Sequence, residues 1–456
     1  LIFSYILIAF WIKESKLRCS KKWKLYVGYG AGMLLAAMMV LAFAACGEDN
    51  GGTPTPTPDV KGMSADVLPR NAMTPSVEIP ADFKIGMICL HDENSTYDNN
   101  FIQALRQVQK DLGLSDDQVV IVTNIGEDSS CYDAAVDLAK NKGCKVIFAD
   151  SFGHESFMKQ AAQEYPEVQF CHATGTSGKI ANIENFHNAF ASIYEGRYLA
   201  GIAAGLKLNE MIAAGKITAE QAVIGYVGAF TYAEVISGMT SFYLGARSVC
   251  PSATMKVRYT GSWYDQAKEQ EAATALIEKD KCVLISQHAD SLGAPTACEL
   301  AGVPNVSYNG STYSAGETTF IISSAINWAP YFQYIIETVV KGEAIAPDWC
   351  GTIATNSVVL SGVNQDVAAE GTIEKINEAI KALEAGTLHV FDTANFTVDG
   401  KTLTEYLADV DGDYTGETNV IHDGYFDESN AVDFRSAPYF DIIIDGVTNL
   451  NTNFGG

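Results

Sequence analysis

Strand-like and helix-like segments alternate along most of this chain, and this rhythm constrains the fold more than any other feature. Short apolar runs, typical of strands buried on both faces, are followed by longer stretches with apolar residues at helical spacing. Such alternation predicts βαβ units around a parallel sheet, and therefore an α/β fold. The first series comprises strands at 84–90, 118–125, 145–150 and 168–175, and helices at 97–112, 132–143 and 155–165.

A second series of similar size follows a long helical stretch at 191–214. Small residues between Ala200 and Gly205 predict that this helix packs closely against another helix, which is a structural role. Two series of similar size predict two Rossmann-like lobes that face each other. The second series comprises strands at 222–230, 256–259, 282–287 and 305–310, and helices at 232–249, 266–279 and 292–301.

The remaining segments set the predicted domain boundaries. A further strand at 318–328 and helix at 329–341 are assigned to the first lobe, because hinged lobes are commonly joined by several crossings. We therefore expect an N-terminal lobe at 77–190 plus 311–345, a C-terminal lobe at 191–310 plus 346–400, and an acidic C-terminal extension at 401–456.

Beyond residue 348 the pattern is less regular. A helix is expected at 374–386 and a hairpin at 389–401, with its turn at Asp399–Gly400. Residues 407–440 are acidic and poor in apolar side chains, so we expect a solvated loop. The acids of DVDGDYTGE at 409–417 do not fall at the positions of a calcium-binding EF-hand loop, and no metal site is predicted.

The formal charge of −25 is unevenly distributed. Residues 1–45 carry six Lys and Arg and one Glu, a net of +5, which leaves −30 for the rest of the chain. Such a surface repels phosphate backbones, so nucleic acid is excluded as a partner.

The first 46 residues resemble a secretory signal. A basic cluster at Lys21–Lys24 precedes a small and apolar run, which ends in LAFAAC at Cys46. Small residues before a cysteine are typical of a lipoprotein signal, so we expect Cys46 to be lipidated; an uncleaved transmembrane anchor is the alternative. Residues 47–76, rich in Gly, Thr and Pro, are predicted to be a disordered spacer, with the fold beginning near Val77. Either reading places the protein outside the cytoplasm on a membrane tether.

The chain lacks the motifs of common enzymes and metal sites. Eight cysteines follow Cys46, none in a CxxC motif, and they are expected to be mostly free and buried. His91, His154 and His288 fall near strand ends beside acids, which leaves a hydrolase as an alternative. No serine or cysteine stands at a nucleophile elbow, however. We predict no catalytic residue, no cofactor and no metal, and hence a binding protein.

Aromatic and polar side chains recur where predicted strands end. Trp263, in the GSWYD stretch, lies between a strand and a helix, where open α/β sheets bind ligands. Aromatic faces and hydrogen-bonding groups in one cleft suit a flat, polar, uncharged ligand. The predicted binding residues are Tyr97, Asp98, Asp150, Phe152, Phe230, Trp263, Asp290, Asn309 and Asn327.

Several blocks of sequence resemble the basic membrane protein family of substrate-binding lipoproteins, specifically its Med-like branch, over about 84–342. The block at 242–280, which contains GSWYDQAKE, is the most specific. The others are FADSFG at 148–153, YEGRYLAGIAAG at 194–205, GYVGAF at 225–230, ISQHADS at 285–291 and NWAPYF at 327–332.

The resemblance implies a type I periplasmic-binding fold, with two lobes on a three-stranded hinge and a ligand cleft between them. Members of the family bind purine nucleosides or bases between two aromatic rings, which would correspond here to Tyr97 and Trp263. Nucleoside-binding members address ribose with an Asp and a Lys, at positions where this chain has Asn309 and Asn327. A free nucleobase and a nucleoside held differently therefore both stay open.

The resemblance also implies the partners. A member of this family would be a lipid-anchored monomer on the extracytoplasmic side of the cell membrane, delivering a purine to an ATP-binding-cassette (ABC) permease. A sensor that presents its ligand to a membrane regulator is an alternative in the same fold, and an extracytoplasmic nucleoside hydrolase is an alternative of a different class.

Overall fold

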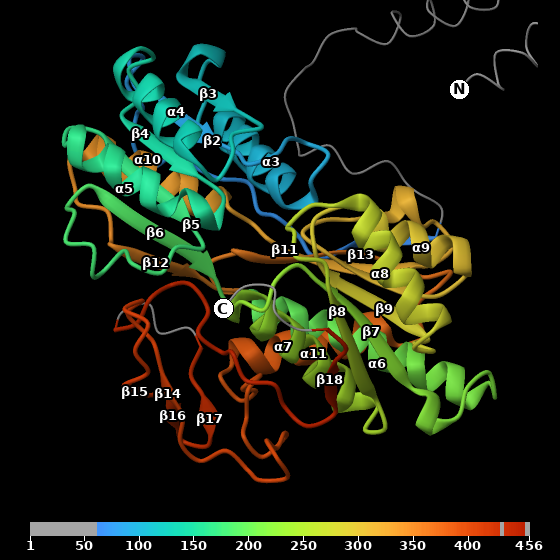
Figure 1. The fold of residues 1–456 in the computed structure, drawn as a ribbon. Helices are drawn as coiled ribbons and strands as arrows, with labels where there is room; N and C mark the ends of the chain where they lie inside the picture. Colours follow the sequence, from blue (N-terminus) through green and yellow to red (C-terminus); the bar gives the residue numbers. More distant parts are fainter. Residues whose placement is uncertain (1–61, 429–432, 452–456) are drawn as a thin grey trace, which may run out of the picture. The chain divides into compact units, whose positions relative to one another are not determined.

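The computed structural model describes residues 62–428 and 433–451, so the predicted signal region and Cys46 lie outside the described residues. Two separate sheets carry the fold, each with its own helices (Figure 1). Their α/β architecture confirms the prediction made from the alternating pattern.

The first sheet is parallel throughout and follows the order β12-β6-β5-β4-β2-β3. Its inner strands are almost entirely buried, which explains why they read as continuous apolar runs, whereas the edge strands β3 and β12 are partly exposed. The strands are β2 (Ile85–Ile88), β3 (Val119–Val122), β4 (Val146–Ala149), β5 (Gln169–Ala173), β6 (Phe186–Ala191) and β12 (Asp348–Gly351), and the helices are α3 (Thr96–Asp111), α4 (Ser129–Lys140), α5 (Glu155–Glu164) and α10 (Ala329–Lys341).

The second sheet has the order β1-β13-β11-β10-β9-β7-β8-β18. It is parallel except at β13, which pairs antiparallel with both of its neighbours. The strands are β1 (Met63–Leu68), β7 (Val223–Gly228), β8 (Thr254–Tyr259), β9 (Leu284–His288), β10 (Asn305–Tyr308), β11 (Phe320–Ile326), β13 (Val358–Asn364) and β18 (Val447–Asn449), and the helices are α6 (Ile193–Ala213), α7 (Ala233–Val249), α8 (Gln266–Glu278), α9 (Gly293–Ala301) and α11 (Thr372–Glu384).

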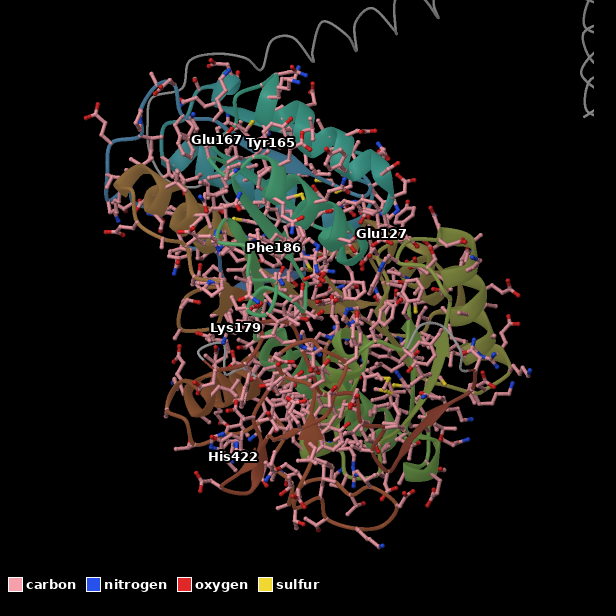
Figure 2. The ribbon with its side chains drawn as sticks, turned by 60° about the vertical axis from the view of Figure 1, so that its left-hand side comes forward. Glu127, Tyr165, Glu167, Lys179, Phe186 and His422 are labelled. Carbon is pink, nitrogen blue, oxygen red and sulfur yellow. The ribbon has the colours of Figure 1, made fainter. Side chains whose placement is uncertain are left out.

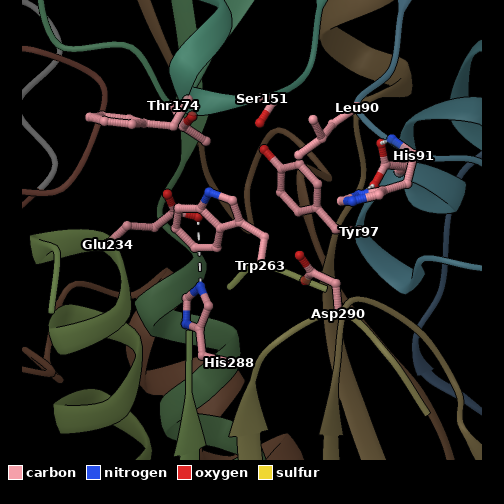
Figure 3. A pocket seen from close by; sticks show the side chains of 11 residues that line it. Leu90, His91, Tyr97, Ser151, Thr174, Glu234, Trp263, His288 and Asp290 are labelled. Atoms are coloured by element: carbon pink, nitrogen blue, oxygen red, sulfur yellow. Dashed lines mark hydrogen bonds and ion pairs between the residues drawn. The ribbon is translucent and has the colours of Figure 1, made fainter. Parts of the chain in front are cut away.

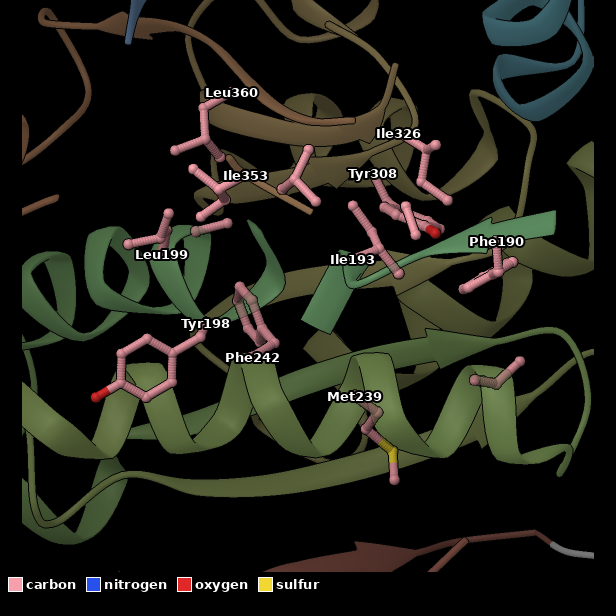
Figure 4. Packing of buried hydrophobic residues seen from close by; sticks show 14 of the residues in the cluster. Phe190, Ile193, Tyr198, Leu199, Met239, Phe242, Tyr308, Ile326, Ile353 and Leu360 are labelled. Atoms are coloured by element: carbon pink, nitrogen blue, oxygen red, sulfur yellow. The ribbon is translucent and has the colours of Figure 1, made fainter. Parts of the chain in front are cut away.

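Helices α6 and α7 touch backbone to backbone, as the small residues of α6 predict. A Cβ added at Gly201 would lie 2.1 Å from the Phe242 carbonyl oxygen, and one at Gly245 would lie 2.0 Å from that of Tyr198. Around this contact Leu199, Phe242 and other apolar side chains fill the core (Figure 4). The pair gives the second lobe a rigid base.

The placement of the late strands differs from the predicted boundaries. Strand β11 was assigned to the first lobe, yet it pairs with β10 in the second sheet. The connection at 309–319 is short, and strands joined by a short connection usually lie side by side. Helix α10, which follows, does pack on α3 and β4 of the first lobe. Strand β12 was assigned to the second lobe but pairs with β6 in the first sheet. The chain therefore passes between the sheets at Ser192, at Asn327 and along 352–357.

The predicted spacer at 47–76 is too long. Strand β1 pairs antiparallel with β13, so ordered structure begins well before Val77. The repeated Thr-Pro pattern stops at Pro58, and the following residues can supply the backbone donors that prolines lack. After β1, residues 69–76 run along the first lobe, where Ser76 N–H donates to Glu337 of α10 and Met73 N–H to Asp111 of α3.

The predicted solvated loop at 407–440 is also wrong for the described residues. Val420, Phe426 and Phe440 are buried, and the two phenylalanine rings lie 4.8 Å apart in edge contact. Polar residues dominate this stretch, but its few apolar side chains gather in one cluster. The turn at Asp399–Gly400 forms as predicted, although it is closed by a single backbone bridge between Val398 and Lys401.

The extension at 401–451, which we call the C-terminal segment, contacts both lobes. Strand β18 pairs with β8, and the Asn451 side chain bonds both backbone groups of Tyr259. Toward the first lobe, Ser436 donates from its backbone and its hydroxyl to the Asp348 carboxylate on β12, at 2.9 and 2.8 Å. Figure 2 labels Lys179, on the first-lobe loop nearest this contact, and His422 within the segment itself.

Candidate ligand-binding cleft

The candidate site is a narrow cavity at the strand ends of both sheets, with an interior of about 10 Å³. An interior of that size holds about one water molecule, so the lobes must separate to admit a larger ligand. The first lobe contributes Leu90, His91, Tyr97, Asp98, Ser151, Phe152 and Thr174, and the second contributes Glu234, Trp263, His288 and Asp290 (Figure 3).

Five of the nine predicted binding residues line this cavity: Tyr97, Asp98, Phe152, Trp263 and Asp290. The other four lie outside its wall. Asp150 is fully buried behind Tyr97, Phe230 packs edge-on against Trp263, and Asn309 lies beside Asp290. Asn327 is remote from the cavity, because its side chain bonds Asn356 and the first turn of α10.

Sequence reasoning missed Glu234 and His288. Both obey the strand-end rule that found the others, since His288 is the last residue of β9 and Glu234 lies in the first turn of the helix after β7. His288 was considered only as a catalytic candidate, and Glu234 looked like an ordinary acid at a helix start.

Two aromatic side chains present their rings to the cavity from opposite lobes. The Tyr97 hydroxyl donates to the Asp150 carbonyl at 2.7 Å, and its ring rests edge-on against Phe101 at 4.9 Å. Trp263 is supported by Phe230, 4.9 Å away between ring centres. Both rings are therefore held from behind, which leaves a face of each available to a flat ligand.

The loop that carries Trp263 is fixed to the loop after β9. The Asp290 N–H donates to the Trp263 carbonyl at 3.0 Å, and Glu269 of α8 accepts from the backbone of Asp265 and Ser291. Gly261 has φ +70°, a conformation that favours glycine, so the GSWYD turn requires this residue. Trp263 and Asp290 therefore move as one unit.

The acids of the cleft differ in their electrostatics. Asp98 accepts from the His91 backbone at 2.7 Å and the Ser95 hydroxyl at 2.6 Å. Burial alone would raise the pKa of Asp98, but the hydrogen bonds from His91 and Ser95 outweigh it and lower the pKa.

Asp150 and Asp290 show the opposite behaviour. Burial, and then repulsion from Asp98, holds the pKa of each well above its usual range. The cleft can therefore present a protonated carboxyl group at Asp290, which donates as well as accepts, beside the ionised Asp98.

No lysine or arginine lines the cavity in the part of the chain that the structure describes. Burial lowers the pKa of His288, so this imidazole is mostly neutral at pH 7. A lining of acids without a basic partner disfavours anions and favours ligands with hydrogen-bond donors, whether cationic or uncharged.

Several buried polar atoms in or beside the cleft lack a partner among the described residues. Such atoms are rare in folded proteins and are commonly satisfied by a ligand or water. They are Asp150 Oδ2, Thr174 Oγ1, His288 Nδ1, Tyr308 Oη and Asn309 Nδ2.

The two lobes also touch across the cleft. The backbone and hydroxyl of Thr96 both donate to the Asp290 carbonyl, at 2.9 and 3.1 Å. The rings of Phe152 and Tyr232 stack with centres 5.2 Å apart. The described conformation is thus a closed one.

Two groups of acidic side chains could in principle approach a metal ion. Cys89, Asp98 and Asp150 meet behind the cleft, where burial raises the pKa of the Cys89 thiol far above its usual value and keeps it protonated. Asp409, Asp411 and Asp413 meet on the C-terminal segment, where Asp409 already pairs with Arg435 at 3.0 Å. Both groups are explained by contacts within the protein.

The eight cysteines that follow Cys46 all lie among the described residues and form no disulfide with one another, and all except the half-buried Cys350 are buried. Among the described residues, no helix combines the length and apolar character needed to cross a membrane.

Two α/β lobes joined by repeated crossings, with a cleft at their facing strand ends, define a type I periplasmic-binding fold. Solved structures share it. A solute-binding protein from Conexibacter woesei matches with a TM-score of 0.54 at 20% identity, covering 67% of this chain and 98% of that one. One from Aeropyrum pernix matches with a TM-score of 0.53 at 16% identity, covering 67% and 87%.

Residues 89–387 match the family model Bmp, described as ABC transporter substrate-binding protein PnrA-like. The chain belongs to this family. The C-terminal segment lies beyond the matched residues.

Two curated relatives are similar over part of their length. A Haloferax volcanii protein, TsgA13, named as an ABC transporter glucose-binding protein, is 35% identical over 49% of this chain and 54% of its own. A Brucella abortus protein named as purine-binding is 30% identical over 57% of this chain and 69% of its own. The chain thus spans about half the length of the first relative and about two thirds of the second.

Proposed function

We propose that this protein is the solute receptor of an ABC importer, and that it captures a purine base or nucleoside in the cleft. The observation that carries the proposal is the pair of supported rings, Tyr97 and Trp263, that face one cavity from opposite lobes. Stacking on an aromatic side chain contributes about 1–3 kcal/mol per base, so two faces could supply a good part of a micromolar affinity.

The polar lining supports the same ligand class. Purines are flat and uncharged, and they carry both donors and acceptors at their edges. The protonated carboxyl group of Asp290 and the ionised one of Asp98, both in the cavity lining, can pair with both kinds of group. Capture also fits better than catalysis at Cys89, the residue before the cleft-lining Leu90, because burial raises its pKa and keeps it in the unreactive thiol form.

Isothermal titration calorimetry against adenine, adenosine, guanosine, inosine and glucose tests the proposal. We expect at least one purine to bind at micromolar concentration, and Trp263→Ala to weaken it by at least about tenfold through loss of one stacking face. Trp349→Ala is the matched control, since Trp349 packs on Tyr331 and Tyr334, away from the cleft, and should leave the affinity unchanged. Binding of glucose alone would overturn the purine assignment.

We further propose that the protein is anchored outside the cytoplasm through lipid on Cys46. The basic and apolar run that ends in LAFAAC supports this. Replacing Cys46 by alanine should release the protein from the membrane fraction, as measured by fractionation and immunoblotting, whereas an uncleaved anchor would retain it.

A further inference from the structure

Glu234 and His288 form a polar pair on the second-lobe side of the cleft. The Glu234 carboxylate lies 3.6 Å from His288 Nε2, and both side chains line the cavity (Figure 3). This separation exceeds a normal hydrogen bond, so the contact orients the carboxylate without using its full accepting capacity.

His288 is itself held in one position. Its ring packs on Tyr308 at 4.5 Å between centres, and a Cβ added at Gly238 would lie 2.9 Å from its Nδ1 atom. The ring therefore rests directly against the backbone of α7, the helix that carries Glu234. His288 fixes the direction of the carboxylate, which makes it a positioning residue.

The Glu234 carboxylate is an acceptor surrounded by other acidic groups. Glu234, Asp290 and Asp150 are all close enough to Tyr97 to raise its pKa, after the larger effect of burial. A carboxylate oxygen accepts hydrogen bonds, and the cavity lining offers the Glu234 side chain no lysine or arginine. A ligand that enters must bring a donor to this point or leave the carboxylate desolvated and unpaired.

We propose that Glu234, positioned by His288, is a specificity-determining residue that accepts a hydrogen bond from an N–H group of a purine. This proposal narrows the ligand class to uncharged purines that carry an N–H donor on the edge facing Glu234. Purines in which this N–H group is alkylated should bind weakly. The proposal rests on the proposed function, because it assumes that a purine occupies the space between Tyr97 and Trp263.

The test compares the affinities of protein variants for ligand variants, as in a double-mutant cycle. Three ligands are titrated into the wild type, Glu234→Gln and Glu234→Ala. They are adenine, 9-methyladenine, which lacks the imidazole N–H, and N6,N6-dimethyladenine, which lacks the amino N–H. Because hydrogen bonds to charged groups are the strong ones, we expect one methylated ligand to bind the wild type at least about tenfold more weakly than adenine. In Glu234→Ala this discrimination should fall to about twofold, since the accepting group is gone. In Glu234→Gln it should fall less far, since the amide oxygen still accepts a hydrogen bond but carries no charge. Glu278→Gln, at an exposed position near the end of α8, is the matched control and should discriminate like the wild type.

His288→Gln checks the positioning role through the same ratio. It should reduce the discrimination as Glu234→Gln does, and the double variant should lose no more than either single one. Equal weakening of all three ligands by Glu234→Gln, or no weakening of any, overturns this inference while the purine assignment stands. If the wild type binds no purine at all, the proposed function fails first.

Discussion

Glu269 is a buried acid outside the cavity lining that holds two loops of the cleft in place. Its side chain is fully buried on α8 and accepts from the backbone of Asp265 and Ser291, at the roots of the two loops that carry Trp263 and Asp290. Burial raises the pKa of Glu269 to about 7, so the folded chain retains a proton that the unfolded chain has lost.

The pH dependence of stability should reveal this proton. Because the folded-state pKa lies above the unfolded value, the free energy of unfolding falls as pH rises from about 4.5 to about 7, by up to about 3 kcal/mol from this group. Glu269→Gln cannot titrate, so urea unfolding at pH 5 and pH 7.5 should show a smaller difference than in the wild type. An unchanged difference would mean that Glu269 ionises normally, and exposed Glu278→Gln controls for the loss of one acid.

At the scale of elements, the contact between α6 and α7 fixes the second-lobe base on which β7 and β9 lie. Gly245→Ala should destabilise the protein by about 1–3 kcal/mol, because the new methyl group would have to displace the Tyr198 backbone. Thermal or urea unfolding measures this. Ala213→Ser, at an exposed position at the end of α6, should change stability by less than about 0.5 kcal/mol. Similar losses for both variants would contradict the close packing.

What the sequence could predict at this scale follows from local pattern. Helix and strand periodicity located the elements of both lobes, and the strand-end rule brought Tyr97, Trp263 and Asp290 to one cavity. The rule failed for Asn327, because this residue lies where the chain leaves β11 for α10 of the first lobe, and its side chain bonds Asn356 there.

The pairing of distant strands could not be predicted in the same way. The sheets that β12 and β18 join depend on which edges the rest of the fold leaves unpaired, and no periodicity in a three- or four-residue strand encodes that choice. Glu234 escaped prediction for a related reason, since its role depends on His288, more than fifty residues away in the sequence.

Across the whole folded part, both ends of the described chain connect the lobes. The N-terminal arm leaves β1 in the second sheet and bonds to α3 and α10, and the C-terminal segment bonds to β12 and β8. Asn451 completes the second connection by bonding the N–H and the carbonyl of Tyr259, at 2.8 and 2.9 Å. Tyr259 ends the strand that leads into the Trp263 loop, so a segment outside the family match supports the cleft.

Asn451→Ala should lower the free energy of unfolding by about 1–2 kcal/mol, since two hydrogen bonds are lost and the backbone of a buried residue is left unpaired. Hydrogen exchange should also quicken at the backbone amides of Tyr259 and Gly261. Asn449→Ala is the control, because that side chain accepts only a 3.3 Å bond from the Tyr259 hydroxyl. Equal effects of the two variants would show that Asn451 does not hold the strand end.

Strand β1 determines where a pulling force on the preceding part of the chain enters the fold. Any load applied to the chain before Gly62 enters the fold through β1 and passes along its antiparallel ladder into β13. The second lobe bears that load directly, whereas the first lobe receives it only through the arm at 69–76 and the crossings between the sheets. An anchor attached upstream of Gly62 would therefore hold the second lobe, which carries Trp263 and Glu234. The first lobe, which carries Tyr97, would be the lobe that moves when the cleft opens.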